Sequence, residues 1–124
     1  MTILKKSSIM IVDDEPDIVL VLAEYLAGEG FKVLTANNGP QAIIKVMDHP
    51  VDLSIIDIAM PEMNGIETLT RMKGLKPKLP VIMITAFRDA EKVLEAFRLG
   101  AYDCIFKPFD LNYLRNSITG SLFE

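Results

Sequence analysis

The chain has 124 residues, half of them hydrophobic, which suits one compact domain with a single core over residues 1–124. Its net charge of −4 argues against nucleic-acid binding by this chain alone, because such binding needs many Lys and Arg contacts with phosphates. The single cysteine, Cys104, excludes an internal disulfide framework, and no apolar stretch approaches the roughly 20 residues that cross a bilayer, so we expect a soluble, cytoplasmic protein with no membrane segment.

The first part of the chain alternates short apolar runs with longer amphipathic stretches. Residues 9–12 are apolar at every position, as is typical of a parallel strand covered on both faces. Pro16 suits the first turn of a helix, and apolar residues then recur every three or four positions. Residues 31–36 alternate more strictly and predict a second strand at an edge of the sheet. Asn38 can cap the next helix, which ends before Pro50.

The middle of the chain repeats this pattern. Residues 53–56 predict a third strand that runs into Asp57. Asn64 followed by Glu67 resembles a capping box and predicts the start of a third helix. Residues 74–77, which contain Gly and Pro, are expected to end it.

The last part predicts two more strands and two more helices. Residues 81–84 form an apolar strand, residues 89–98 a charged amphipathic helix, and residues 102–106 a fifth strand. Asp110 can cap a final helix. Strands that alternate with helices predict βαβ units, so we expect an α/β fold with a doubly wound parallel sheet of five strands and with five helices.

Residues whose side chains can bind ligands or take part in catalysis stand at the ends of four of the five predicted strands. These residues are Asp13 and Asp14, Asp57, Thr85 and Lys107. The carboxyl ends of parallel strands meet at one edge of an open sheet, where ligands bind at the topological switch point. We therefore expect residues that are distant in sequence to form one site.

Three carboxylates at such a site repel one another unless a cation joins them or one of them is protonated. Magnesium prefers oxygen ligands and is commonly held by one or two carboxylates together with a phosphate, so we predict Asp14 and Asp57 as direct ligands. A carboxylate can also be a nucleophile toward phosphorus while a lysine neutralises the transferring oxygens, roles that fit Asp57 and Lys107. Thr85 could donate its hydroxyl to a phosphoryl oxygen.

These residues resemble the receiver domains of two-component response regulators. The resemblance spans the whole chain and rests on four motifs in the expected order, each at a predicted strand end: Val12-Asp13-Asp14-Glu15, Asp57 with Met60-Pro61-Glu62-Met63-Asn64-Gly65, Ile84-Thr85-Ala86, and Lys107-Pro108-Phe109.

The resemblance implies a flavodoxin-like sheet in the order 2-1-3-4-5. It also implies magnesium-dependent phosphoryl transfer to Asp57 from the phosphohistidine of a sensor histidine kinase or a histidine phosphotransfer protein. The backbone carbonyl of Ala59 would be the third protein ligand to Mg²⁺, and Asp13 would act mostly through water. The peptide bond before Pro108 would be cis. Phosphorylation would change partner binding through the face of the fourth helix, fifth strand and fifth helix.

One position departs from the family pattern. Receiver domains usually have an aromatic switch residue three positions before the lysine, and here that position is Cys104. Tyr102, Phe106 or Phe87 could substitute for it, and the sequence does not choose among them. Cys104 itself is expected to be a small buried hydrophobe, with a redox sensor as the alternative.

Three other functions are weighed against this prediction. A phosphatase that uses an aspartyl phosphate typically has a second acid two residues after the nucleophile, where this chain has Ala59. A nucleotide or flavin carrier of the same fold would need a phosphate loop after the first strand, where Asp13 and Asp14 would repel phosphate. A docking module that works without phosphorylation remains the alternative. The cognate kinase, an output domain and a homodimer are left open by the sequence.

Overall fold

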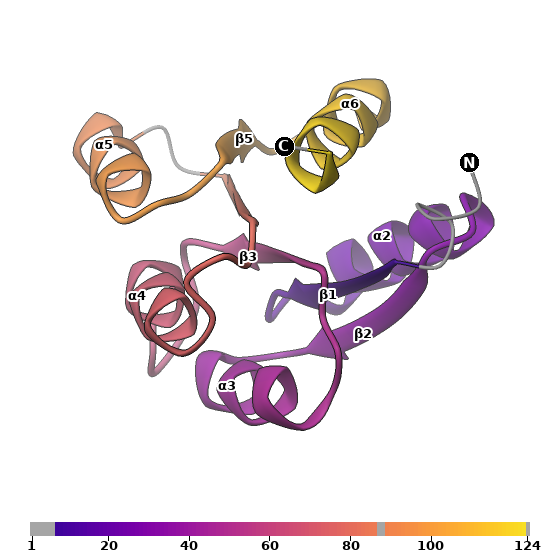
Figure 1. The fold of residues 1–124 in the computed structure, drawn as a ribbon. Coiled ribbons are helices and arrows are strands. Elements are labelled where there is room, and N and C mark those ends of the chain that lie inside the picture. The colour runs from indigo at the N-terminus through magenta and orange to yellow at the C-terminus, as the bar shows by residue number, and fades with distance from the viewer. Residues whose placement is uncertain (1–6, 87–88, 124) are drawn as a thin grey trace.

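The computed structural model describes residues 7–86 and 89–123 and contains, within them, five strands and five helices. Strands and helices alternate along the whole described chain (Figure 1). Their bounds are β1 (Ser8–Val12), α2 (Pro16–Gly28), β2 (Lys32–Ala36), α3 (Gly39–Asp48), β3 (Leu53–Asp57), α4 (Gly65–Leu75), β4 (Val81–Thr85), α5 (Ala90–Arg98), β5 (Asp103–Phe106) and α6 (Leu111–Leu122).

The strands form one parallel sheet in the order β2-β1-β3-β4-β5, which confirms the expected topology. The order reverses at β1, whose neighbours are β2 on one side and β3 on the other. The prediction that residues 31–36 form an edge strand is confirmed, and β5 forms the opposite edge. The crevice at the switch point therefore lies between the ends of β1 and β3.

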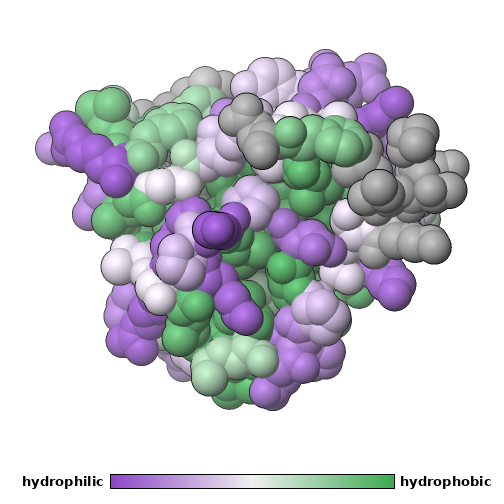
Figure 2. Space-filling view, viewed as in Figure 1, coloured by the Kyte–Doolittle hydropathy of each residue, from purple (hydrophilic) through white to green (hydrophobic). Residues whose placement is uncertain are grey.

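Alternate residues of the central strands point into two separate cores. Met10 and Val12 pack with α3, α4 and α5, whereas Ile9 and Ile11 pack with α2 and α6. The helices accordingly cover both faces of the sheet in Figure 1. This two-sided burial explains why β1, β3 and β4 are apolar at nearly every position instead of alternating. Polar and apolar side chains are interspersed over the outer face seen in Figure 2.

The helix starts follow the predicted caps. Asn38 Oδ1 accepts the Gln41 N–H at 2.8 Å, and Asn64 Oδ1 accepts the Glu67 N–H at 2.9 Å. Asp110 Oδ1 likewise accepts a backbone N–H of the first turn of α6 at 2.7 Å. These bonds satisfy N–H groups that have no partner inside the helix.

Helix α4 ends at Leu75, within the predicted stop at residues 74–77, and two predicted strands began one residue too early. The second strand begins at Lys32 instead of residue 31. Helix α4 continues through Gly74, because the Lys76 N–H still bonds to the Met72 carbonyl at 2.8 Å. A glycine tolerates a helical conformation, whereas Pro77, which has no N–H, cannot extend the helix. The fifth strand begins at Asp103 instead of residue 102.

The loop between β3 and α4 holds the end of β3 in place. The Gly65 N–H donates to the Ile58 carbonyl at 2.8 Å, and a Cβ atom at Gly65 would overlap the backbone carbonyl of Asp57. Within this loop Glu62 has a φ of 66°, a left-handed conformation that residues with a side chain rarely adopt. The first residue of α4 thus has to be a glycine for the chain to pass so close to Asp57.

Candidate functional site at the carboxyl ends of the strands

The strand register brings the predicted residues to one edge of the sheet. Val12 pairs with Ile56, so Asp13 follows β1 beside Asp57, the last residue of β3. On the other side Thr85 is the last residue of β4 and pairs with Phe106, immediately before Lys107. All of the predicted strand-end residues therefore lie at the carboxyl edge, as expected for a parallel sheet.

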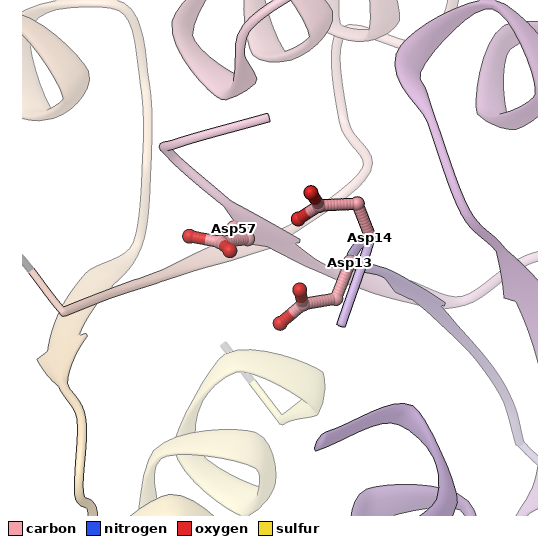
Figure 3. A group of neighbouring side chains, drawn as sticks. All are labelled: Asp13, Asp14 and Asp57. Atoms are coloured by element: carbon pink, nitrogen blue, oxygen red, sulfur yellow. The ribbon is translucent and has the colours of Figure 1, made fainter. Parts of the chain in front are cut away.

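The three aspartates form a compact acidic cluster. One carboxylate oxygen from each of Asp13, Asp14 and Asp57 lies within 4.8 Å of the others. Figure 3 shows the three side chains projecting from the ends of two neighbouring strands into a common space. Asp13 and Asp57 are buried, with exposures of 0% and 2%, whereas Asp14 is exposed. Two buried anions at this separation are unfavourable without a compensating cation.

Lys107 supplies part of that compensation. Its Nζ lies 3.0 Å from Asp13 Oδ2, 3.2 Å from Asp57 Oδ2 and 2.6 Å from Glu15 Oε1. Burial favours the neutral amine, but the hydrogen bonds to Glu15 and Asp13 and the nearby carboxylate charges outweigh it and raise the pKa of Lys107. The lysine is therefore a fixed positive charge at the centre of the cluster.

Glu15 is a member of the site that the sequence analysis did not assign. It is the N-cap residue of α2, and its side chain makes no capping hydrogen bond with the helix. The side chain instead reaches across to Lys107, although it is 58% exposed. The signal in the sequence was its position directly after Asp13 and Asp14. An acidic residue at the start of a helix is already explained by its favourable interaction with the helix dipole, so the sequence offered no reason to assign it to the site.

Asp57 is the carboxylate whose ionisation is most perturbed. Burial, and then the charge of Asp13, raise the pKa of Asp57 from 3.8 to about 6, against the opposing effects of Lys107 and of the Ala59 N–H. That N–H donates to Asp57 Oδ1 at 3.2 Å and orients the carboxylate. A poorly solvated carboxylate that is still largely ionised at neutral pH can act as a nucleophile.

Thr85 and Ala59 line a pocket beside the carboxylates. The pocket has a volume of about 250 Å³ and is lined by Ile58, Ala59, Thr85, Asp89 and Lys92. Thr85 is 1% exposed, and its backbone carbonyl accepts the Lys107 N–H at 2.8 Å, which ties the ends of β4 and β5 together. The lining begins at Ile58, the residue that follows Asp57.

The chemistry of this donor set fits a magnesium ion. Asp13, Asp14 and Asp57 offer hard carboxylate oxygens, the ligand type that Mg²⁺ prefers. With Glu15 included, the site holds four carboxylates, three of which bond to the single Lys107 ammonium, so a further divalent charge would balance most of the excess negative charge. The Ala59 carbonyl as a ligand stays a prediction.

The cis peptide bond expected between Lys107 and Pro108 is present.

Cys104 lies half-buried in β5, where burial and then the charge of Asp103 raise the pKa of its thiol. It borders a pocket of about 380 Å³ that also contacts Phe106 and Tyr113. Phe87, one of the residues considered as a substitute for the missing aromatic, lies outside the described residues.

Comparison with known proteins identifies the family of this chain. The family model for the response regulator receiver domain matches residues 9–119, and the chain belongs to this family. It is therefore a signalling module of two-component systems. Within residues 7–86 and 89–123, none of the helices has the length and apolar character needed to span a bilayer.

Similar proteins support this assignment. The transcriptional regulatory protein ZraR of Klebsiella oxytoca is 40% identical over 92% of this chain and 26% of its own length, and the regulatory protein AtoC of Escherichia coli is 42% identical over 86% and 23%. The chain thus spans about a quarter of the length of these relatives. A CheY-like receiver domain protein from Methanospirillum hungatei, 29% identical, superposes with a TM-score of 0.92 over 95% of this chain and 94% of that one. TrrA from Thermotoga maritima, solved in complex with Mg²⁺ and BeF, is 32% identical with a TM-score of 0.85 over 94% and 99%.

Proposed function

We propose that this chain is a phosphorylation-controlled switch that accepts a phosphoryl group on Asp57. The donor is a phosphohistidine on a sensor histidine kinase or a histidine phosphotransfer protein. The observation that carries the proposal is the burial of Asp57 beside Asp13 with the Lys107 ammonium 3.2 Å from its carboxylate. Membership in the receiver family and the likeness to a structure that holds Mg²⁺ and BeF support it.

The residues divide the chemistry among them. A carboxylate oxygen of Asp57 attacks the phosphorus, the P–N bond of the donor breaks, and its electron pair goes to the imidazole, which takes a proton from solvent. Lys107 donates to the transferring oxygens and offsets their charge, and the Thr85 hydroxyl donates to another. When bound by Asp13, Asp14, Asp57 and the Ala59 carbonyl, Mg²⁺ would supply positive charge toward the phosphoryl oxygens.

The switch follows from the added charge. A phosphoryl group brings about −1.5 to −2 of charge to Asp57, and Thr85 and Lys107 are drawn toward it. Thr85 precedes the segment that leads to α5, Lys107 follows β5, and the bond between their backbones couples the two movements. The surface formed by α5, β5 and α6 then changes its affinity for a partner; an output domain, an effector protein and a second copy of the chain are the candidates.

A phosphorylation-independent docking module of the same fold is the alternative. In that case the acidic cluster would serve only to bind the cation, and the α5, β5 and α6 surface would have one fixed conformation. We propose no turnover activity, since the acid that a phosphatase of this type uses two residues after the nucleophile is replaced by Ala59. We place the protein in the cytoplasm, where phosphohistidine donors of this kind act.

The proposal is tested by intact mass spectrometry after incubation with acetyl phosphate. The wild type, Asp57→Asn and the control Asp48→Asn, an exposed carboxylate at the end of α3, are each treated with and without Mg²⁺. We expect one added phosphoryl group on the wild type and the control, only with Mg²⁺, and none on Asp57→Asn. Labelling of Asp57→Asn would contradict the assignment of Asp57. Absence of labelling in every sample, with Mg²⁺ binding intact, would favour the docking module.

A further inference from the structure

Each N–H of the Lys107 ammonium group already has a carboxylate acceptor. An ammonium group has three N–H donors, and the three oxygens around Nζ belong to Asp13 at 3.0 Å, Asp57 at 3.2 Å and Glu15 at 2.6 Å. A phosphoryl oxygen on Asp57 would be a new acceptor for the same ammonium. One of the present partners therefore has to give up its hydrogen bond when that acceptor arrives.

Glu15 is the partner whose release costs least. The side chains of Asp13 and Asp57 are 0% and 3% exposed, so as the phosphoryl group approaches, before its bond to Asp57 has formed, loss of Lys107 would leave either buried anion without its ammonium partner. The Glu15 side chain is 58% exposed, and water can solvate its carboxylate after release. Its release also leaves α2 unchanged, because Glu15 makes no side-chain capping bond to that helix.

We propose that Glu15 is a latch on Lys107 that restrains phosphoryl transfer to Asp57. In the unphosphorylated state its carboxylate occupies the third N–H of the ammonium, and it swings into solvent when a phosphoryl oxygen takes its place. Glu15 is thus a positioning residue that acts through Lys107 and stabilises the unphosphorylated state. The inference rests on the proposed function and adds to it a residue that sets the rate of the reaction.

The test compares Glu15→Ala with Asp17→Ala. Both variants remove one exposed carboxylate from the start of α2, but Asp17 has no contact with Lys107 among the described ion pairs. The rate of labelling by acetyl phosphate is measured by quenched mass spectrometry at saturating Mg²⁺ and in 0.5 M salt. At that ionic strength the Debye length is about 4 Å, so the general effect of losing a charge is suppressed.

We expect Glu15→Ala to be labelled roughly threefold faster than the wild type, the scale set by a partly exposed ion pair, and Asp17→Ala to match the wild type. A second readout is the ¹⁵Nζ resonance of Lys107 in the metal-free protein, which should shift in Glu15→Ala and stay in place in Asp17→Ala. Equal labelling rates in Glu15→Ala and wild type, or an unchanged Lys107 resonance, would overturn the latch.

Failure of the latch is distinguishable from failure of the proposed function. If the wild type is labelled at Asp57 and Glu15→Ala is labelled at the same rate, only the latch is wrong. If the wild type is not labelled, or if Asp57→Asn is labelled as well, the phosphoacceptor assignment is wrong and the latch falls with it.

Discussion

Replacing Asp57 with asparagine should stabilise the metal-free protein at alkaline pH. The ionised carboxylate is 2% exposed and shares its surroundings with the buried Asp13. An asparagine has nearly the same shape and carries no charge; its one side-chain oxygen can accept the Ala59 N–H, but the amide NH₂ that replaces the other oxygen cannot accept the bond from Lys107. Lys107 remains neutralised by Asp13 and Glu15 in the variant.

The expected gain follows from the pKa of Asp57, which rises from 3.8 to about 6 on folding. The folded protein therefore binds a proton more readily than the unfolded chain between these values, so the contribution of Asp57 to stability falls as pH rises from about 4 to about 6. At about 1.4 kcal/mol per pH unit, the full loss above pH 7 is roughly 3 kcal/mol. The favourable effect of Lys107 is already included in the shifted pKa.

The assay is urea unfolding followed by circular dichroism, with EDTA, at pH 8 and at pH 4.5. Asp57→Asn should exceed the wild type by about 2 to 3 kcal/mol at pH 8 and by much less at pH 4.5. Glu24→Gln, which neutralises an exposed carboxylate in the middle of α2, should match the wild type at both pH values. An Asp57→Asn variant no more stable than the wild type at pH 8 would refute the argument.

Three further predictions concern the metal and the loop after β3. Mg²⁺ at 100 times its dissociation constant should raise the free energy of unfolding of the wild type by about 2.7 kcal/mol, as measured by urea titration. In Asp14→Asn the same Mg²⁺ concentration should give only a small part of this stabilisation. Gly65→Ala should lower the free energy of unfolding by more than about 2 kcal/mol, because the new Cβ would overlap backbone atoms. Gly74→Ala, which has open space around it, should raise the free energy of unfolding by up to about 1 kcal/mol. Equal effects of the two substitutions would contradict this reasoning. Glu62→Gly should keep or raise the melting temperature and Glu62→Val should lower it, since φ is 66° there.

The architecture and the principal site residues could be predicted because both depend on one-dimensional features. A strand buried on both faces is apolar at nearly every position, so short runs rich in Ile, Val, Leu and Met predicted β1, β3 and β4. The site residues could be grouped because parallel strands share a carboxyl edge, which places Asp13, Asp57, Thr85 and Lys107 together whatever their sequence separation. Neither inference required knowledge of side-chain conformations.

The contact between Glu15 and Lys107 could not be predicted in the same way. Glu15 is an exposed residue at a helix N-terminus, and a carboxylate there is already favourable through the helix dipole. Whether it points along its own helix or across to Lys107 depends on the path of the chain after β5 and on side-chain conformation. The pocket lined by Cys104, Phe106 and Tyr113 could not be predicted either, because its shape depends on side-chain conformations.

The stability cost at Asp57 and its proposed reactivity have one physical cause. Burial beside Asp13 withholds water from the carboxylate, which destabilises the folded anion and also leaves its oxygens less solvated and more basic. With a pKa of about 6, the group is still roughly nine-tenths ionised at pH 7, so it keeps its charge while losing hydration. Lys107 opposes the effect of burial, since its charge and its hydrogen bond lower the pKa of Asp57 and so favour the ionised nucleophile. A site that relieved the strain by substituting asparagine would gain stability and lose the atom that accepts the phosphoryl group.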